Sequence, residues 1–245
     1  MIRFALILIY IVLVLVPIGL PLLPVFWLIR LCSPKFCDRL TYPLVRFFAN
    51  GVGFLAGMKL KTEYEEELPK GEAFLFVANH RSFFDEFAAF EALDRPFAFV
   101  SKAEYRKIPS MNSWMKLLHC VFVDRGNLRD GLRSVEEIET GIKNGYSFWI
   151  HPEGTRSQKD QMLPFHEGSF RPAFRTGTRI VPVTIVRTDD LFEKHEPKVR
   201  PARVTLHFGK PVATEGLDRV QQRALIAQIH AGIQSGYERL IASGQ

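Results

Sequence analysis

The sequence has few cysteines and no spacing typical of a structural metal site. Its 245 residues contain three cysteines, Cys32, Cys37 and Cys120, with no Cys-x2-Cys pair. An odd number of cysteines without paired spacing disfavours both a disulfide framework and a zinc domain, and the reducing side of a membrane is the simpler location. We therefore expect neither a metal nor a bound cofactor.

Signatures of nucleic-acid binding are also missing, although the chain is basic. The net charge is +6 and the sequence pI is about 9.3, but no run of five basic residues occurs. The charge instead suits phosphate groups, anionic lipid or an acidic protein, and we expect no nucleic-acid partner. Repeats and low-complexity segments are lacking, and 47% hydrophobic residues suffice for one substantial core.

Charge is absent from the segment between Phe4 and Ile29, which is long enough to cross a hydrocarbon core of about 30 Å. A cleaved signal peptide is disfavoured, because the apolar stretch exceeds the usual length of roughly 7–15 residues and lacks a small-residue cleavage pattern. Pro17, Pro21 and Pro24 leave two alternatives open, a spanning helix and a bent or re-entrant segment.

The basic residues next to this segment predict its orientation. Only Arg3 precedes it, whereas Arg30, Lys35 and Arg39 follow it closely. The positive-inside rule then places the rest of the chain on the cytoplasmic face of the cell (inner) membrane.

A second apolar-rich stretch covers residues 36–57, with Leu40, Leu44 and Phe47 at helical spacing. It is either an interfacial helix or an amphipathic helix packed on the core. We therefore divide the chain into membrane-associated helical segments at 1–57 and an α/β domain at 58–245.

Beyond Met58, apolar runs of strand length alternate with helical patterns. Pro182 lies inside one run, which predicts an edge strand or a bulge there. Strands buried on both faces and separated by helices predict an α/β fold with a largely parallel central sheet flanked by helices, preceded by the N-terminal membrane-associated helical segment. The runs are 74–78, 97–100, 120–123, 147–150, 180–186 and 203–208, and the clearest helices lie at 128–142 and 225–240.

The first strand ends at His80, and Asp85 follows five residues later. Within one continuous helix or strand these side chains would point apart. Ser82 with Asp85 predicts a capping box that opens a helix, so the chain breaks between the pair and lets them meet. Asp85 can then accept a hydrogen bond from one imidazole nitrogen while the other takes a proton. The alternative is that Asp85 is only a cap and His80 only a turn residue.

His119 and Asp124 have the same spacing. A β-branched and aromatic run separates them, and an extended chain would hold them roughly 16 Å apart. We reject this second pair.

Further polar residues follow two other predicted strands. Arg125 follows one, and Glu153, Gly154 and Arg156 follow the next. The carboxyl ends of parallel strands meet at one edge of a sheet, and guanidinium groups there suit a phosphate monoester. Gly154 would let the backbone approach a ligand, and Glu153 would accept a substrate hydroxyl or orient an arginine. Solvated loop residues or ordinary ion pairs are the alternative.

Together these blocks resemble the glycerolipid acyltransferases, most closely the bacterial 1-acylglycerol-3-phosphate acyltransferases, over roughly residues 55–210. Each block is weak alone, and four in the same order are a strong signal. The matching blocks are Asn79-His80 with Asp85, Val123-Asp124-Arg125, Pro152-Glu153-Gly154-Thr155-Arg156-Ser157 and Val181-Pro182-Val183.

The resemblance implies transfer of a fatty acyl group from an acyl-CoA or acyl carrier protein thioester to the free hydroxyl of a membrane lysophospholipid. His80 is implied to be the general base and Asp85 its orienting carboxylate. Val181 and Pro182 would help to shape the acyl-donor region. The implied acceptor site comprises Arg125, Glu153, Gly154, Thr155, Arg156 and Lys102.

The acceptor that best fits the resemblance is 1-acylglycerol 3-phosphate, which would give phosphatidic acid, and a lyso-ornithine lipid is an alternative. A membrane-bound lipid esterase and a non-catalytic lipid-binding anchor are the rivals from other classes. His151 stands where the family usually has an apolar residue, and Asn112 where glycine is common. His151 is either a second titrating group or, more in keeping with its type, a satisfied structural histidine.

Replacement of His80 by alanine should abolish acyl transfer while the protein stays folded and membrane-bound. Loss of a general base typically costs about 10²- to 10⁴-fold in rate. Turnover of an acyl thioester with lysophosphatidic acid measures the effect, and retained activity would contradict the assignment.

Overall fold

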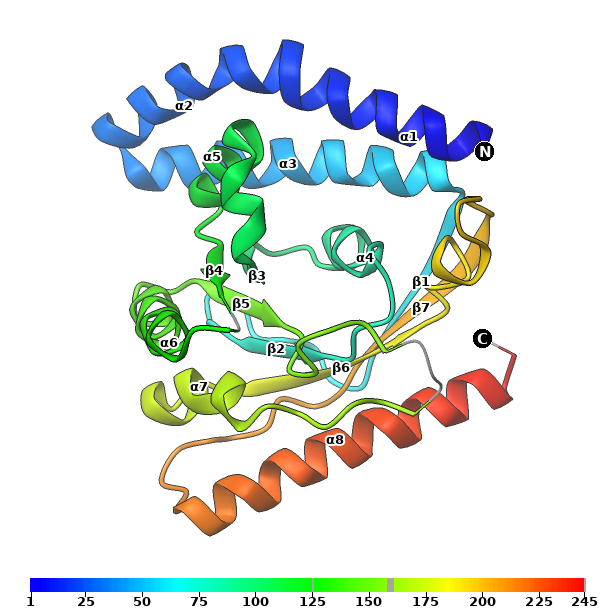
Figure 1. Cartoon of the computed structure of the whole chain (residues 1–245). Helices are drawn as coiled ribbons and strands as arrows, with labels where there is room; N and C mark the ends of the chain where they lie inside the picture. The colour runs from blue at the N-terminus through cyan, green and yellow to red at the C-terminus, as the bar shows by residue number, and fades with distance from the viewer. Residues whose placement is uncertain (125, 158–160, 245) are drawn as a thin grey trace.

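A seven-stranded sheet forms the centre of the protein in a computed structural model that describes residues 1–124, 126–157 and 161–244. The strand order is β1-β7-β6-β2-β5-β3-β4. All neighbouring strands are parallel except β6 and β7, so the predicted α/β fold with a largely parallel sheet is confirmed (Figure 1). The strands are β1 (Met58–Tyr64), β2 (Leu75–Ala78), β3 (Phe97–Lys102), β4 (Val121–Val123), β5 (Ser147–Ile150), β6 (Ile180–Val186) and β7 (Ala202–Phe208).

Two features of the sheet differ from the sequence prediction. Strand β1 was not predicted, because its charged residues alternate with few apolar ones at an edge of the sheet. The prediction of an edge strand or a bulge at Pro182 is wrong. Strand β6 lies between β2 and β7, and Pro182 pairs in regular register with Val77. The proline is tolerated because the ladder to β7 begins only at Val183, and the Pro182 carbonyl accepts the amide of Gly209 just beyond it.

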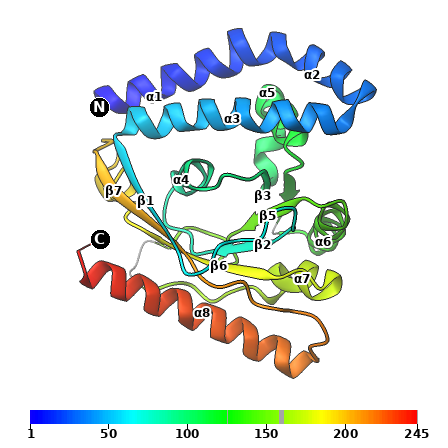
Figure 2. The ribbon, with the colours of Figure 1, turned by 180° about the vertical axis from the view of Figure 1, so that it is seen from behind.

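Helices cover both faces of the sheet, and each face has its own apolar core (Figures 1 and 2). Phe76 and Trp149 point to the face covered by α3 and α4, whereas Leu75 and Val77 point to the face covered by α6, α7 and α8. This alternation explains why the strands are apolar throughout. The helices are α1 (Ile2–Leu13), α2 (Leu20–Cys32), α3 (Pro34–Ala56), α4 (Asp85–Ala92), α5 (Pro109–Leu117), α6 (Leu128–Lys143), α7 (Arg171–Thr176) and α8 (Arg219–Ala242).

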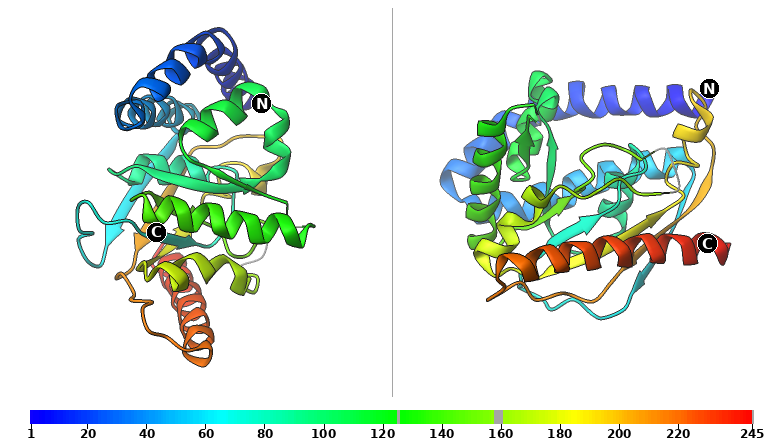
Figure 3. Two further views of the ribbon diagram at one scale, coloured as in Figure 1. Left: turned by 90° about the vertical axis from the view of Figure 1, so that its left-hand side faces the viewer. Right: turned by 60° about the horizontal axis from the view of Figure 1, so that its bottom comes forward.

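The N-terminal segment is a bent helix, and α3 runs back alongside it, as Figure 3 shows from two further directions. Helices α1 and α2 are joined by the π-helical turn Val14–Gly19, which contains Pro17, whose missing amide accounts for the bend. Arg3 donates to the Leu55 carbonyl (2.7 Å), so α1 and α3 run antiparallel. By length and composition, the helix from Ile2 to Cys32 is long enough to cross a membrane.

Helix α3 is joined to the sheet domain by a polar contact at its start. Asp38 accepts hydrogen bonds from His119 Nε2 (2.9 Å) and the Tyr146 hydroxyl (2.7 Å). His119 therefore pairs with Asp38, which agrees with the rejection of Asp124 as its partner. Helix α3 is buried along the side that faces the core, but Phe47 and Phe54 on it are 70% and 81% exposed.

Replacement of Ile233 by alanine should destabilise the fold by about 2–5 kcal/mol. Its side chain is 1% exposed in the core beneath α8, so truncation leaves a cavity. Chemical denaturation followed by circular dichroism measures the loss. Val220 on the same helix is 77% exposed, and its replacement by alanine should change stability by less than about 0.5 kcal/mol. Equal effects of the two substitutions would contradict this packing.

Candidate active site

The site lies where β2 and β5 end side by side. Val77 pairs with Ile150 in parallel register, so the residues that follow these two strands emerge next to each other. Asn79 fixes the first loop, because its side chain both accepts the Ile185 amide (2.7 Å) and donates to the Ile185 carbonyl (2.9 Å). His80 and His151 are thereby presented at the same edge, as the sequence predicted for the ends of parallel strands.

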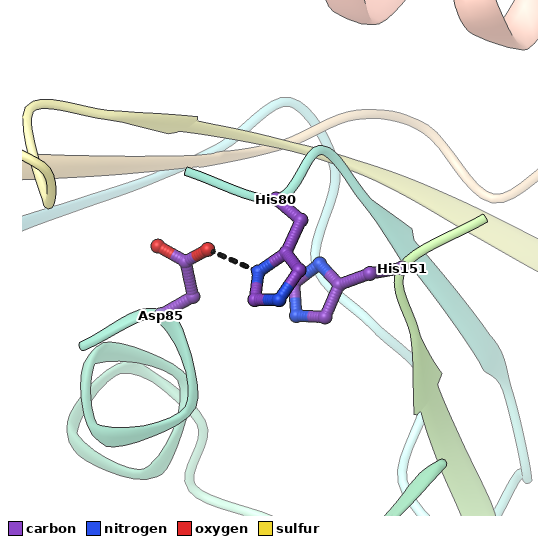
Figure 4. Close-up of side chains that lie close together, drawn as sticks. All are labelled: His80, Asp85 and His151. Atoms are coloured by element: carbon purple, nitrogen blue, oxygen red, sulfur yellow. Dashed lines mark hydrogen bonds and ion pairs between the residues drawn. The ribbon is translucent and has the colours of Figure 1, made fainter. Parts of the chain in front are cut away.

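His80 and Asp85 form the hydrogen bond that their spacing predicted (Figure 4). The distance from His80 Nδ1 to Asp85 Oδ2 is 2.8 Å. The same oxygen also accepts the backbone amides of Arg81 (2.8 Å) and Ser82 (3.0 Å). Asp85 is fully buried, and these three donors, all on Oδ2, offset part of the cost of burying its carboxylate.

The predicted capping box is formed only in part. Helix α4 begins at Asp85 itself, with Phe84 as its N-cap. The carboxylate does bond to the Ser82 amide as a capping box requires, but the Ser82 hydroxyl accepts the amide of Phe84 (3.0 Å). Residues 82–84 thus form a separate turn, which gives the chain room to bring His80 and Asp85 together.

The pKa values of this pair are shifted toward the charged forms. Burial of the His80 imidazole favours the neutral form, but the hydrogen bond and charge of Asp85, with the charge of Glu86, outweigh it and raise the pKa. Burial likewise opposes ionisation of Asp85, yet the hydrogen bond and charge of His80 hold its pKa below the usual range. Asp85 is therefore suited to stabilise an imidazolium at position 80.

His151 is a satisfied structural residue stacked on His80. The two ring centroids are 4.2 Å apart at 19° (Figure 4). Nδ1 of His151 donates to the Asn79 carbonyl (2.9 Å), and Nε2 accepts the Trp149 indole (3.1 Å). Burial, with the charge of His80, lowers its pKa to about 3, so the ring stays neutral. The structure thus favours the structural role for this residue over a second titrating group.

Glu153 is buried and holds the backbone of the site. One carboxylate oxygen accepts a hydrogen bond from the His80 amide (2.7 Å), and the other accepts one from the Leu163 amide (2.8 Å). Its position therefore favours support of His80 over contact with a substrate. The next residue, Gly154, has φ of 74°, a backbone conformation that favours glycine and lets the loop turn back toward β2.

Two of the predicted cationic residues lie at the mouth of the site. Arg156 and Lys102 line the same cavity as His80, and Thr155 lies beside them. The Arg156 side chain is 46% exposed and donates to Glu193 (2.9 Å), a residue that the motif did not include. Arg125, which the sequence predicts as part of the acceptor site, lies outside the described part of the chain.

An apolar cavity of about 410 Å³ opens beside His80, in the range typical of ligand pockets. Its walls come from the N-terminal helices, α3, α4, β3 and α5. Val181 and Pro182 are not among its described lining residues, because both lie within β6, where Val181 is fully buried. The predicted role of these two residues in the acyl-donor region has no support in this geometry. The apolar walls include Val14, Leu15, Leu22, Phe87, Trp114 and Met115.

Glu86 is a titratable residue that lines the cavity and lies outside the motif blocks. One of its oxygens lies 3.9 Å from His151 Nε2, and its side chain is 35% exposed. Burial, reinforced by the charge of Asp85 and opposed by that of His80, raises the pKa of Glu86 to about 7. Its adjacency to Asp85 was the only signal in the sequence.

His80, Asp85 and His151 also place potential metal-ligand atoms within 4.8 Å of one another. Nδ1 of His80 is engaged by Asp85, and both nitrogens of His151 are engaged by other groups. Metal binding would break these hydrogen bonds, so the cluster fits proton transfer better than metal coordination.

Replacement of Glu86 by glutamine should lower the pKa of His80. The negative charge of Glu86 favours the imidazolium, and the glutamine keeps the shape without the charge. NMR titration of the His80 ring should give a pKa above the ordinary value of about 6.5 in the parent protein and a lower value in the variant. Glu91→Gln on the same helix is the control and should leave the titration unchanged. An unshifted His80 in Glu86→Gln would contradict the coupling.

Comparison with known proteins shows which family the chain belongs to. The family model described as Acyltransferase matches residues 59–186, which is just over half of the chain. The 1-acyl-sn-glycerol-3-phosphate acyltransferase alpha of Ovis aries is 24% identical over 218 residues, covering 89% of this chain and 76% of that protein. A probable 1-acyl-sn-glycerol-3-phosphate acyltransferase of Mycoplasma pneumoniae is 33% identical over 162 residues, covering 62% of this chain and 57% of that protein.

A solved structure extends the similarity to the whole fold. The 1-acyl-sn-glycerophosphate acyltransferase PlsC of Thermotoga maritima is 28% identical, with a TM-score of 0.82 over 98% of this chain and 97% of that one. The chain therefore belongs to the acyltransferase family and is an enzyme of that class.

Proposed function

We propose that this enzyme transfers a fatty acyl group from an acyl-CoA or acyl carrier protein thioester to the free hydroxyl of 1-acylglycerol 3-phosphate, forming phosphatidic acid. The observation that carries the proposal is the His80–Asp85 pair, which opens onto an apolar cavity with Arg156 and Lys102 at its mouth. Such a site combines a base for the hydroxyl, space for an acyl chain and cations for a phosphate. The names of the similar proteins support the same acceptor.

In the proposed reaction, Asp85 holds Nδ1–H of His80, so Nε2 is the basic nitrogen. Nε2 takes the proton of the acceptor hydroxyl as its oxygen attacks the thioester carbonyl carbon. The tetrahedral intermediate then expels the thiolate, which takes the proton back from Nε2. No covalent enzyme intermediate is needed, and Asp85 stabilises the imidazolium throughout.

The acceptor phosphate would be held by Arg156 and Lys102, with Thr155 beside them, and Arg125 is proposed as a further ligand from the motif. Guanidinium and ammonium groups bind a dianion by charge-assisted hydrogen bonds. Glu153 would act through the backbone of His80, because both of its oxygens are engaged by amides.

The helices of residues 1–57 are proposed to seat the α/β domain, residues 58–245, on the cytoplasmic face of the membrane. Large apolar side chains of α1, α2 and α3 face away from the protein, including Leu28 at 63%, Leu31 at 82% and Phe54 at 81% exposed. An acceptor that carries an acyl chain resides in the bilayer, so the cavity beneath these helices would receive it there. The net charge of +6 would favour anionic lipid and an acidic carrier protein.

The assay that tests this proposal supplies the purified full chain with labelled acyl-CoA or acyl carrier protein thioester and lysophosphatidic acid. Formation of labelled phosphatidic acid is expected. Release of free fatty acid without diacyl product would instead indicate an esterase, and binding without turnover would indicate a lipid anchor. A panel that includes a lyso-ornithine lipid identifies the acceptor.

Replacement of Arg156 by alanine should raise the KM for lysophosphatidic acid with a smaller effect on kcat. The substitution removes a contact to the phosphate that is present before and during the reaction. A monoacylglycerol, which has no phosphate, should show little change in kcat/KM. An unchanged KM for lysophosphatidic acid would remove Arg156 from the phosphate site.

A further inference from the structure

One carboxylate outside the four motif blocks joins two parts of the site. Glu193 lies in the connection between β6 and β7 and its side chain is 10% exposed. Its Oε2 accepts the Ser82 hydroxyl (2.6 Å), and its Oε1 accepts the Phe83 amide (2.7 Å). The same Oε1 accepts Nη1 of Arg156 at 2.9 Å. Glu193 thus contacts both the turn between His80 and Asp85 and the proposed phosphate ligand.

The segment that carries Glu193 is itself fixed in place. The Asp189 carboxylate accepts a hydrogen bond from the guanidinium of buried Arg81 (2.6 Å). It also lies 3.2 Å from the Lys194 ammonium. The neighbouring Phe192 stacks on Phe4 of α1 with ring centroids 5.5 Å apart and planes at 7°. Contacts on both sides therefore hold the segment that carries Glu193 against Arg81 and α1.

The hydrogen bonds of Glu193 determine where Arg156 can lie. The Arg156 side chain is nearly half exposed, and an exposed arginine without a fixed partner samples many rotamers. Among the residues that the structure describes, Glu193 engages one of the five N–H donors of the guanidinium, so the group is oriented while its other donors can still bind a ligand. Because Ser82 and Phe83 share the same carboxylate, the orientation is set relative to His80.

We propose that Glu193 is a positioning residue for the acceptor phosphate, which holds Arg156 in register with the catalytic turn. This inference rests on the proposed function and assigns a role to a residue that the motifs do not contain. Pre-orientation reduces the entropy lost when the phosphate binds, so it should act mainly on acceptor binding. The charge of Glu193 is shared among three donors, which limits its repulsion of the phosphate.

Glu193→Gln is the informative variant, because the amide can keep contacts to Ser82 and Phe83 while it loses the charge that orients Arg156. We expect the KM for lysophosphatidic acid to rise about three- to fivefold, as befits a partly exposed ion pair, with kcat within about twofold. The kcat/KM for a monoacylglycerol, which has no phosphate, should fall by less than the kcat/KM for lysophosphatidic acid. Glu215→Gln, an exposed residue with the same charge change, is the control and should match the parent enzyme.

A double-mutant cycle separates action through Arg156 from a general structural effect. In an Arg156→Ala background, Glu193→Gln should add no further rise in the KM. Glu193→Ala should lower kcat as well, because the turn then loses two hydrogen bonds. An unchanged or lower KM in Glu193→Gln, or additive effects in the cycle, would overturn the proposal.

Failure of the proposed function has a different outcome. If the parent enzyme forms no phosphatidic acid from lysophosphatidic acid, that function is wrong. The inference is then tested by the equilibrium binding of lysophosphatidic acid. Binding is measured as the rise in melting temperature that the ligand causes. Weaker binding in Glu193→Gln that disappears in the Arg156→Ala background supports the positioning role, and equal binding by the parent and the variant overturns it.

Discussion

The hydrogen bond between His80 and Asp85 requires the chain to leave β2 after Ala78, turn, and begin α4 at Asp85. The buried carboxylate stabilises this turn, because the same oxygen that accepts the imidazole also accepts two amides of the turn. One group therefore orders the backbone and sets the tautomer of the histidine. Much of the surrounding structure serves to keep this short segment in place.

That support comes from elements far apart in the sequence. Asn79 fixes the start of the turn to β6, Glu153 holds the His80 amide from the loop after β5, and Glu193 holds the turn from outside. Each uses a carboxylate or amide side chain to hydrogen-bond backbone groups, which are buried at Ile185, partly buried at His80 and exposed at Phe83. The result is a site assembled at the ends of β2 and β5 and held by hydrogen bonds from distant parts of the chain.

The cavity adds a second constraint. Its apolar walls come partly from the N-terminal helices, so the apolar N-terminal segment and the site share one space. Glu86 and His151 are two of the polar residues that line this cavity with His80. Burial raises the pKa of Glu86 to about 7 and lowers that of His151 to about 3, so the surroundings disfavour the charged form of both side chains.

The order of strands and helices, the apolar N-terminal segment and the His80–Asp85 pair could be predicted from the sequence, because periodicity and turn chemistry are local. Strand β1 was missed, since an edge strand with alternating charges lacks an apolar run. The roles of Glu193 and Glu86 could not be predicted in this way. Glu193 meets Ser82 across 111 residues of chain, and only the packing of the β6–β7 connection over the turn decides that contact.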